Sequence, residues 1–159
     1  GVCYLHHCQV VHRDLHAVNI LVDEDGHVAI ADFGLADILD DRTESSSHSG
    51  SVRWMAPELL NPGLSPCGCF QRTSASDMYS LACIFLELFT LHALFMEVSA
   101  EAGVVMWVLK GVRPSFPSLG DCGGRVISAS LWHVMESCWA RLPGMRPTAD
   151  TLRTRLLEL

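Results

Sequence analysis

One stretch near the N-terminus decides the fold of this chain, and it reads His12-Arg13-Asp14-Leu15-His16-Ala17-Val18-Asn19. Two short motifs follow it, Asp32-Phe33-Gly34 and Ala56-Pro57-Glu58. Between the first two motifs, the β-rich runs 19–22 and 27–31 flank Asp25-Gly26, a pair that favours a tight turn. The sequence therefore predicts a β-hairpin, and this hairpin sets the distance between Asn19 and Asp32.

The residue types in these motifs suit one kind of chemistry. Phosphoryl transfer needs a carboxylate to take a hydroxyl proton, and it needs an amide and a second carboxylate to hold the metal ions that neutralise the phosphates. The order and spacing of the three motifs resemble the signature of protein kinases. The resemblance extends over residues 1–159 and implies the C-terminal lobe of a kinase domain. That lobe is an α+β fold, mainly α-helical, with a small β-hairpin bearing the catalytic loop and the Asp-Phe-Gly segment, and without the N-lobe.

The resemblance also divides the chain into parts. It implies a catalytic loop at 12–19, an activation segment at 32–58 and a helical subdomain at 76–159. Apolar periodicity and helix-ending signals predict helices over 57–60, 76–91, 100–110, 130–139 and 147–159. The last of these helices is predicted to have one apolar face, made by Thr148, Leu152, Leu156 and Leu157.

The stretch 78–95 is apolar enough to raise the question of a membrane span. Glu87 and His92 interrupt it, and an ionisable group at the centre of a bilayer costs at least ~2.5 kcal/mol. A buried helix explains the stretch better, so we expect no membrane span.

By the resemblance, three residues carry the reaction. Asp14 would take the proton from the substrate hydroxyl, while Asn19 and Asp32 would hold Mg²⁺ ions on the phosphates of ATP. Leu21 matches the floor on which the adenine ring sits, although packing within a strand would also account for a leucine there. Arg13 would receive a phosphate group on the activation segment, because a guanidinium pairs well with a phosphate dianion.

The activation segment carries several hydroxyl residues. The candidates for phosphorylation are Thr43, Ser45, Ser46, Ser47 and Ser49, and a serine-rich loop that is merely solvated is the alternative. The segment 50–58 is most similar to the tyrosine-kinase-like group of serine/threonine kinases, with Ser51 where a threonine usually bonds the catalytic aspartate. A serine or threonine of a protein is therefore the expected substrate.

Further residues match supporting parts of the family. Glu58 and Arg146 resemble the ion pair that ties the activation segment to the last helices. Asp77 resembles the helix acid that accepts N–H groups from the catalytic loop. His12 and Phe33 resemble two lower members of a hydrophobic stack that continues into the small lobe.

One position departs from the family pattern. Serine/threonine kinases usually place a lysine two residues after the catalytic aspartate, whereas this chain has His16 there. A free imidazole is mostly neutral at pH 7, because its ordinary pKa is about 6.5. His16 therefore offers the ATP phosphates a hydrogen bond but not a dependable positive charge. The chain also has a single lysine, Lys110, and no glycine-rich phosphate loop.

Two hypotheses follow, because some of the residues expected of a protein kinase are present and others are missing. The first is the C-terminal lobe of an active serine/threonine kinase, which would need a small lobe or another partner to cover the apolar floor of its ATP site. The second is a catalytically inactive kinase-like binding module or truncated pseudokinase. Asp14, Asn19 and Asp32 favour the first hypothesis, whereas His16 and the missing small-lobe motifs favour the second. Either way, we expect the 159 residues alone to bind ATP weakly.

The amino-acid composition limits which classes of binding partner and which cellular compartment are expected. The formal net charge is -7 and no run of lysine and arginine is present, so no binding to nucleic acid is expected. The seven cysteines are odd in number and scattered, which predicts no disulfide framework and an intracellular, cytoplasmic location. The thiol and imidazole groups of Cys3, His6, His7 and Cys8 are possible zinc ligands, but ordinary packing at a helix end is the simpler interpretation.

Overall fold

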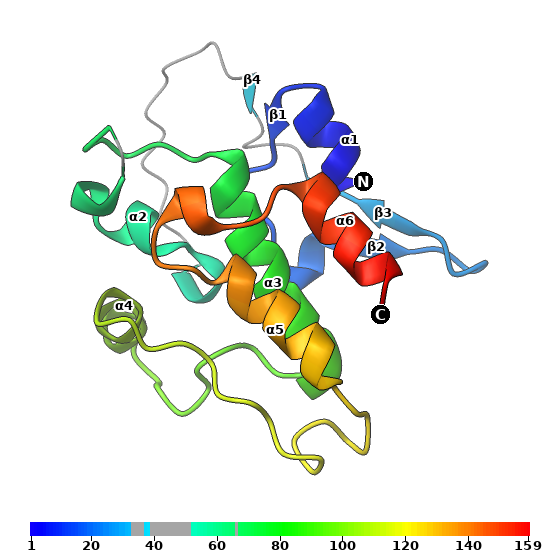
Figure 1. Cartoon of the computed structure of the whole chain (residues 1–159). Coiled ribbons are helices and arrows are strands. Elements are labelled where there is room, and N and C mark those ends of the chain that lie inside the picture. The colour runs from blue at the N-terminus through cyan, green and yellow to red at the C-terminus, as the bar shows by residue number, and fades with distance from the viewer. Residues whose placement is uncertain (33–36, 39–51, 66) are drawn as a thin grey trace.

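The computed structural model describes residues 1–32, 37–38, 52–65 and 67–159. Its α-helices are α1 (Val2–His7), α2 (Pro57–Leu60), α3 (Ser74–Thr90), α4 (Glu101–Leu109), α5 (Ala129–Cys138) and α6 (Ala149–Leu157). Short 3-10 helices cover Ala17–Asn19, Val52–Trp54, Pro62–Leu64 and Pro143–Met145. The fold is mainly helical with little sheet, as the sequence predicts, and α3 runs through its middle (Figure 1).

The strands form two separate antiparallel pairs. Strand β1 (Val10–Val11) pairs with β4 (Asp37–Ile38), and β2 (Ile20–Val22) pairs with β3 (Val28–Ile30). In the second pair, Leu21 lies opposite Ala29, and Val22 lies opposite Val28. This pair is the predicted hairpin, and its turn projects from the helical body (Figure 1).

A capping box fixes the start of the central helix. The Thr73 hydroxyl accepts a hydrogen bond from the backbone N–H of Ser76, and the Ser76 hydroxyl accepts one from the backbone N–H of Thr73. Because two exposed N–H groups are satisfied in this way, α3 begins at Ser74. The predicted start of this helix at Ser76 is therefore two residues too late.

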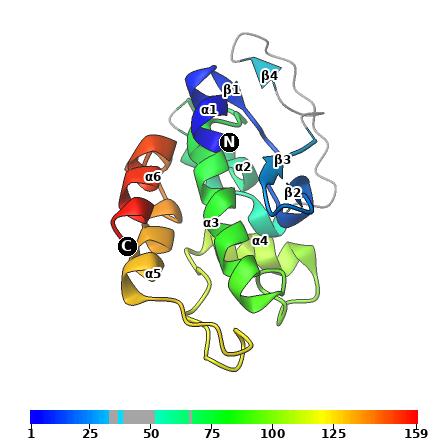
Figure 2. The same ribbon diagram turned by 90° about the vertical axis from the view of Figure 1, so that its right-hand side faces the viewer.

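Helix α3 is the predicted buried helix. Its buried apolar side chains are Met78, Tyr79, Ala82, Cys83, Ile84 and Leu86, and it lies between the α5–α6 pair and the β2–β3 hairpin (Figure 2). The helix ends at Thr90, because Leu91 takes a left-handed backbone conformation with φ 58°. None of the helices within the described residues has the length and apolar character needed to cross a bilayer.

The C-terminal helix differs from its prediction in start and in exposed face. It begins at Ala149, because the Thr148 side chain caps it by accepting from the N–H of Thr151. Leu152 is 2% exposed, but Leu157 is 74% exposed. Helix α6 packs on α1 and α5, and a residue one step along a helix is rotated by about 100° away from its neighbour. Leu157 therefore does not belong to the buried face.

The predicted ion pair between Glu58 and Arg146 is present. The Arg146 guanidinium donates from both terminal nitrogens to the Glu58 carboxylate at 2.7 Å, and both side chains are buried. Arg146 also donates to the carbonyl oxygens of Ala75 and Ala140, each at 2.9 Å. These bonds connect α2 with the start of α3 and with the segment that precedes α6.

One pair of cysteines is bonded, although the sequence predicts no disulfide framework. Cys67 and Cys69 form a disulfide in the exposed connector between α2 and α3. The bond joins residues two positions apart and closes a local turn at Gly68, whose φ is 64°. It therefore links no distant elements. The remaining five cysteines are free, and three of them are buried.

Candidate active site

Asp77 holds the catalytic loop against α3. Its carboxylate is 2% exposed and accepts hydrogen bonds from the backbone N–H groups of His12, at 2.8 Å, and Arg13, at 3.0 Å. The predicted contact of this acid with the loop is therefore present. The His6 ring adds a third contact, with its Nε2 3.0 Å from Asp77 Oδ2. The sequence offered no signal for this pair.

The backbone of the site is held in conformations that non-glycine residues rarely adopt. Arg13 has φ 75° and Asp32 has φ 59°. Such residues cost free energy and persist where the surrounding structure holds them. For Arg13 part of that support is visible, because Asp77 binds its N–H group. Both residues belong to the predicted catalytic set.

Asp14, His16 and Asn19 lie together. The Asn19 side-chain nitrogen donates to the Asp14 carbonyl oxygen at 2.9 Å. His16 Nε2 lies 3.4 Å from Asp14 Oδ2 and 3.3 Å from the Asn19 side-chain nitrogen. Asn19 is 6% exposed, while Asp14 and His16 each keep 21% of their side-chain surface exposed. The His16 ring thus contacts the predicted proton acceptor and the predicted metal ligand.

The hairpin brings the backbone next to Asp32 into contact with Asn19 and with the His12 ring. Ala31, which precedes Asp32, donates its N–H to the Asn19 carbonyl oxygen at 2.8 Å. The Ala31 carbonyl oxygen is 2.9 Å from Nε2 of the buried His12 ring. Two hydrogen bonds therefore connect Ala31, the residue before Asp32, to the catalytic loop. Asp32 itself is exposed.

Some predictions fall on residues outside the described ranges. Phe33 is one of them, so the stack predicted for His12 and Phe33 is not described. Ser51 lies outside as well, and so do the phosphorylation candidates Thr43, Ser45, Ser46, Ser47 and Ser49.

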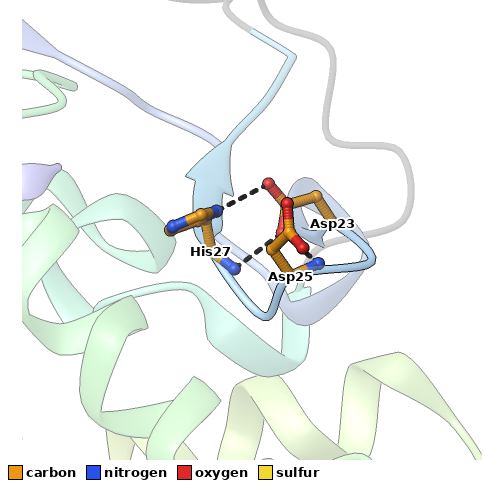
Figure 3. A group of neighbouring side chains, drawn as sticks. All are labelled: Asp23, Asp25 and His27. Carbon is orange, nitrogen blue, oxygen red and sulfur yellow. Dashed lines mark hydrogen bonds and ion pairs between the residues drawn. The ribbon is translucent and has the colours of Figure 1, made fainter.

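The turn of the hairpin is stabilised by its own side chains (Figure 3). Asp23 accepts hydrogen bonds from the backbone N–H groups of Asp25, at 3.0 Å, and His27, at 2.8 Å, and from His27 Nδ1 at 3.0 Å. These bonds, above all the one from the His27 backbone, lower the pKa of Asp23. The three side chains are close enough to share a metal ion. They are exposed and already bonded to one another, so we assign them to the turn.

The hairpin exposes apolar side chains on both faces. Leu21, the predicted adenine floor, is 54% exposed, and Val22 and Val28 are more exposed still. Neighbouring residues of a strand point to opposite faces, so Leu21 and Val22 present apolar surface on the two sides of the hairpin. The floor is uncovered within the described part of the chain.

The donor atoms at this place are of the kind that binds magnesium. The Asn19 side-chain nitrogen donates to the Asp14 carbonyl oxygen, so the Asn19 amide oxygen is the atom that would hold a metal ion. Asp32 supplies carboxylate oxygens from the end of the hairpin. Mg²⁺ prefers oxygen ligands and usually binds through one or two protein groups together with substrate phosphates. Asn19 and Asp32 offer such a set.

The four residues considered for zinc do not gather. His6 contacts Asp77, and His7 Nε2 lies 3.3 Å from Asp150 Oδ2 on the surface. Cys3 and Cys8 are free thiols. Helix-end packing therefore accounts for this cluster.

Sequence reasoning missed Arg72. Its Nη1 donates to the Arg13 carbonyl oxygen at 2.7 Å, and it lines a small pocket together with Arg13, Asp14 and Trp54. No motif precedes Arg72, and it lies far from Asp14 in the sequence. The contact arises only when α3 packs against the catalytic loop.

Comparisons with known proteins agree with this geometry. Residues 1–156 match the protein-family model described as Protein kinase domain. The chain is 36% identical over 155 residues to mitogen-activated protein kinase kinase kinase 1b of Physcomitrium patens, covering 97% of this chain and 18% of that protein. It is 31% identical to serine/threonine-protein kinase STY17 of Arabidopsis thaliana, over 100% of this chain and 25% of that protein. It is 34% identical to cytoplasmic tyrosine-protein kinase BMX of Mus musculus, over 100% of this chain and 23% of that protein. The chain spans about a fifth to a quarter of the length of these relatives.

Proposed function

The chain belongs to the protein kinase family, and from that premise we propose that its site transfers the γ-phosphate of ATP to a serine or threonine hydroxyl of a protein. The main support is the contact of Asn19 with Asp14 and with the residue that precedes Asp32. The proposal includes a division into a catalytic loop at 12–19, an activation segment at 32–58 and a helical subdomain that follows.

Each residue has a stated task in this proposal. Asp14 accepts the proton of the substrate hydroxyl, and its position depends on Asn19 and Asp77. The Asn19 amide oxygen and the Asp32 carboxylate hold Mg²⁺. The metal, when bound, neutralises charge on the phosphates. Leu21 supports the adenine ring, and His16 donates a hydrogen bond to a phosphate.

The substrate class rests on two lines of support. Segment 50–58 is most similar to that of tyrosine-kinase-like serine/threonine kinases, and STY17 is named a serine/threonine-protein kinase. BMX, however, is named a tyrosine-protein kinase. We therefore propose serine or threonine as the acceptor, with Arg13 binding a phosphate on the activation segment.

The proposal also includes a partner and a compartment. The exposed side chains of the hairpin, Leu21 among them, favour a small lobe or another polypeptide that covers the ATP floor. Five free cysteines support an intracellular, cytoplasmic location. In that location, we expect the exposed Cys67–Cys69 bond to be reduced.

A second candidate is a kinase-like binding module without activity. The position of His16 favours it, because its ring contacts Asp14 and Asn19 where the family usually has a lysine for the γ-phosphate. Phosphoryl-transfer charge stabilisers are worth roughly 10³-fold or more. A site without one would hold partners rather than turn over ATP.

One experiment separates the two candidates. The full-length protein and its Asp14→Asn variant are incubated with Mg-ATP and with serine/threonine or tyrosine peptide libraries, and transferred phosphate is counted. We expect transfer to serine and threonine that falls by about 10²- to 10⁴-fold in the variant, because the proton acceptor is lost. Transfer that is equal in both proteins would come from a contaminating kinase, so this result, like no transfer by either protein, would leave the binding module as the better description.

A further inference from the structure

The catalytic loop is held on a second side by a residue outside the kinase motifs. We propose that Arg72 is a positioning residue for Asp14 and supplies the fixed positive charge that His16 does not. The inference rests on the proposed function, since it assigns a task to Arg72 within that reaction. Four observations support it: the hydrogen bond from Arg72 to Arg13, the rare backbone conformation of Arg13, the partial burial of the Arg72 side chain and the position of Arg72 just before α3.

The hydrogen bond acts on the peptide that joins Arg13 to Asp14. Arg72 Nη1 is 2.7 Å from the Arg13 carbonyl oxygen, a short distance that is typical of a charged donor. On the other side of Arg13, its N–H is held by Asp77 at 3.0 Å. Arg13 has φ 75°, so a residue in a rare conformation is bound at both its N–H and its carbonyl group. The next residue is Asp14, whose direction depends on that conformation.

The two anchors of Arg13 lie close together in the chain, at and just before the start of α3. Arg72 precedes Thr73, which caps α3, and Asp77 lies in the first turn of the same helix. The guanidinium of Arg72 also lies over the Phe70 ring, with 5.9 Å to the ring centroid. Groups that hold a reactive side chain do so best when they sit on a helix whose own position is fixed. The start of α3 is fixed by its capping box and by its packing in the core.

The charge of Arg72 lies close to Asp14. Burial lowers the pKa of Arg72, and the nearby Asp14 carboxylate opposes that effect. An arginine remains protonated in either case. Both residues line one pocket, and partly buried charges are screened less by salt than exposed ones. Arg72 Nε is buried without a hydrogen-bond partner among the described residues. The guanidinium therefore keeps capacity for a further acceptor at this place.

This arrangement compensates for the departure at His16. A lysine two residues after the catalytic aspartate would bring a cation by sequence proximity, whereas Arg72 brings one through the tertiary structure. Its charge offsets negative charge that gathers beside Asp14 during phosphate transfer. It acts through Arg13 and Asp14, so its effect should fall on turnover and not on nucleotide binding.

Three variants test the proposal. Arg72→Met removes charge and donor at similar length, Arg72→Lys keeps a cation, and Arg153→Met makes the same change at an exposed site on α6. In the full-length protein we expect Arg72→Met to lower kcat by about 10- to 100-fold, the loss of one charged hydrogen bond, with the KM for ATP unchanged within twofold. Arg72→Lys should recover most of kcat, and Arg153→Met should match the unaltered protein.

A second readout does not depend on activity. The carbonyl ¹³C resonance of Arg13 senses the hydrogen bond that its oxygen accepts. In the 159-residue chain we expect this resonance to move in Arg72→Met, to return toward its original position in Arg72→Lys and to stay in place in Arg153→Met. If Arg72→Met does not fold, Arg72→Gln takes its place, and the same loss of kcat is expected because the charge is absent.

The outcomes separate the two proposals. If no protein transfers phosphate, the proposed function fails, and the Arg13 resonance alone decides whether Arg72 holds the loop. If phosphate is transferred but Arg72→Met leaves both kcat and the Arg13 resonance unchanged, the Arg72 inference is overturned. If Arg72→Lys is as slow as Arg72→Met, the charge has no role and the inference is overturned as well.

Discussion

Asp77 and Leu21 mark two regions of one site, and the two regions differ in burial. Asp77 is 2% exposed and binds the catalytic loop from inside the helical body, whereas Leu21 is 54% exposed on a hairpin that projects from it. The base of the site is thus built from buried charged groups with partners. The hairpin that carries the predicted adenine floor exposes apolar groups, which the described residues leave uncovered. The contrast indicates that the fold itself positions the catalytic loop, whereas the hairpin surface keeps apolar area for a further contact.

The largest expected effect lies in the buried base. Glu58→Gln keeps the shape of the side chain but leaves Arg146 as a buried cation without its partner charge. We expect a loss of about 3–5 kcal/mol in the free energy of unfolding, measured by urea denaturation. The control is Glu136→Gln, which removes an exposed carboxylate beside His133 and should cost about 0–1 kcal/mol. Similar losses of unfolding free energy in both variants would show that the buried ion pair contributes no more than an exposed one.

The same substitution in the two regions should have unequal effects. Leu152→Ser cuts a side chain that is 2% exposed in the core, and we expect a loss of about 2–5 kcal/mol. Leu21→Ser on the hairpin should change unfolding by less than about 0.5 kcal/mol. In the full-length protein, however, it should raise the KM for ATP several-fold. An unchanged KM would remove Leu21 from the nucleotide site.

A smaller effect is expected from alkaline pH. Burial raises the pKa of the Cys83 thiol to about 12, from an ordinary value of 9.0. The unfolded chain therefore loses this proton first, so the contribution of Cys83 is present below pH 9 and is lost as the pH rises toward 12.

Urea midpoints at pH 8 and pH 10.5 measure this loss. Cys83→Ala should reduce the fall in the urea midpoint between pH 8 and pH 10.5. Cys8→Ala, which changes an exposed thiol, should leave that fall unchanged. A fall that is equally steep in both variants would show that the buried thiol is not its source.

The motifs allowed several features of the site to be predicted. The hairpin, the contact of Asp77 with the loop and the Glu58–Arg146 pair are all present. The hairpin follows from residue types at fixed spacing, whereas the other two features follow from the resemblance to protein kinases. The helix start at Ser74 was missed because Ser76 is itself a common capping residue, and only the hydrogen bonds show that Thr73 is the cap. The prediction places Leu157 on the apolar face of the last helix because of its residue type, but the structure leaves it exposed.

The sequence by itself determined the family and the helix-rich class, and it singled out Asp14, Asn19 and Asp32 as the candidate site, because local order and chemical type carry that information along the chain. Only the tertiary structure decided that Arg72 binds the Arg13 carbonyl group, that His6 meets Asp77 and that His16 turns to Asp14 and Asn19. Arg72 and His6 lie far from their partners in sequence, and a hydrogen bond depends on distances of a few ångströms that the packing of α3 sets. The direction of the His16 ring depends on the fold of the whole loop.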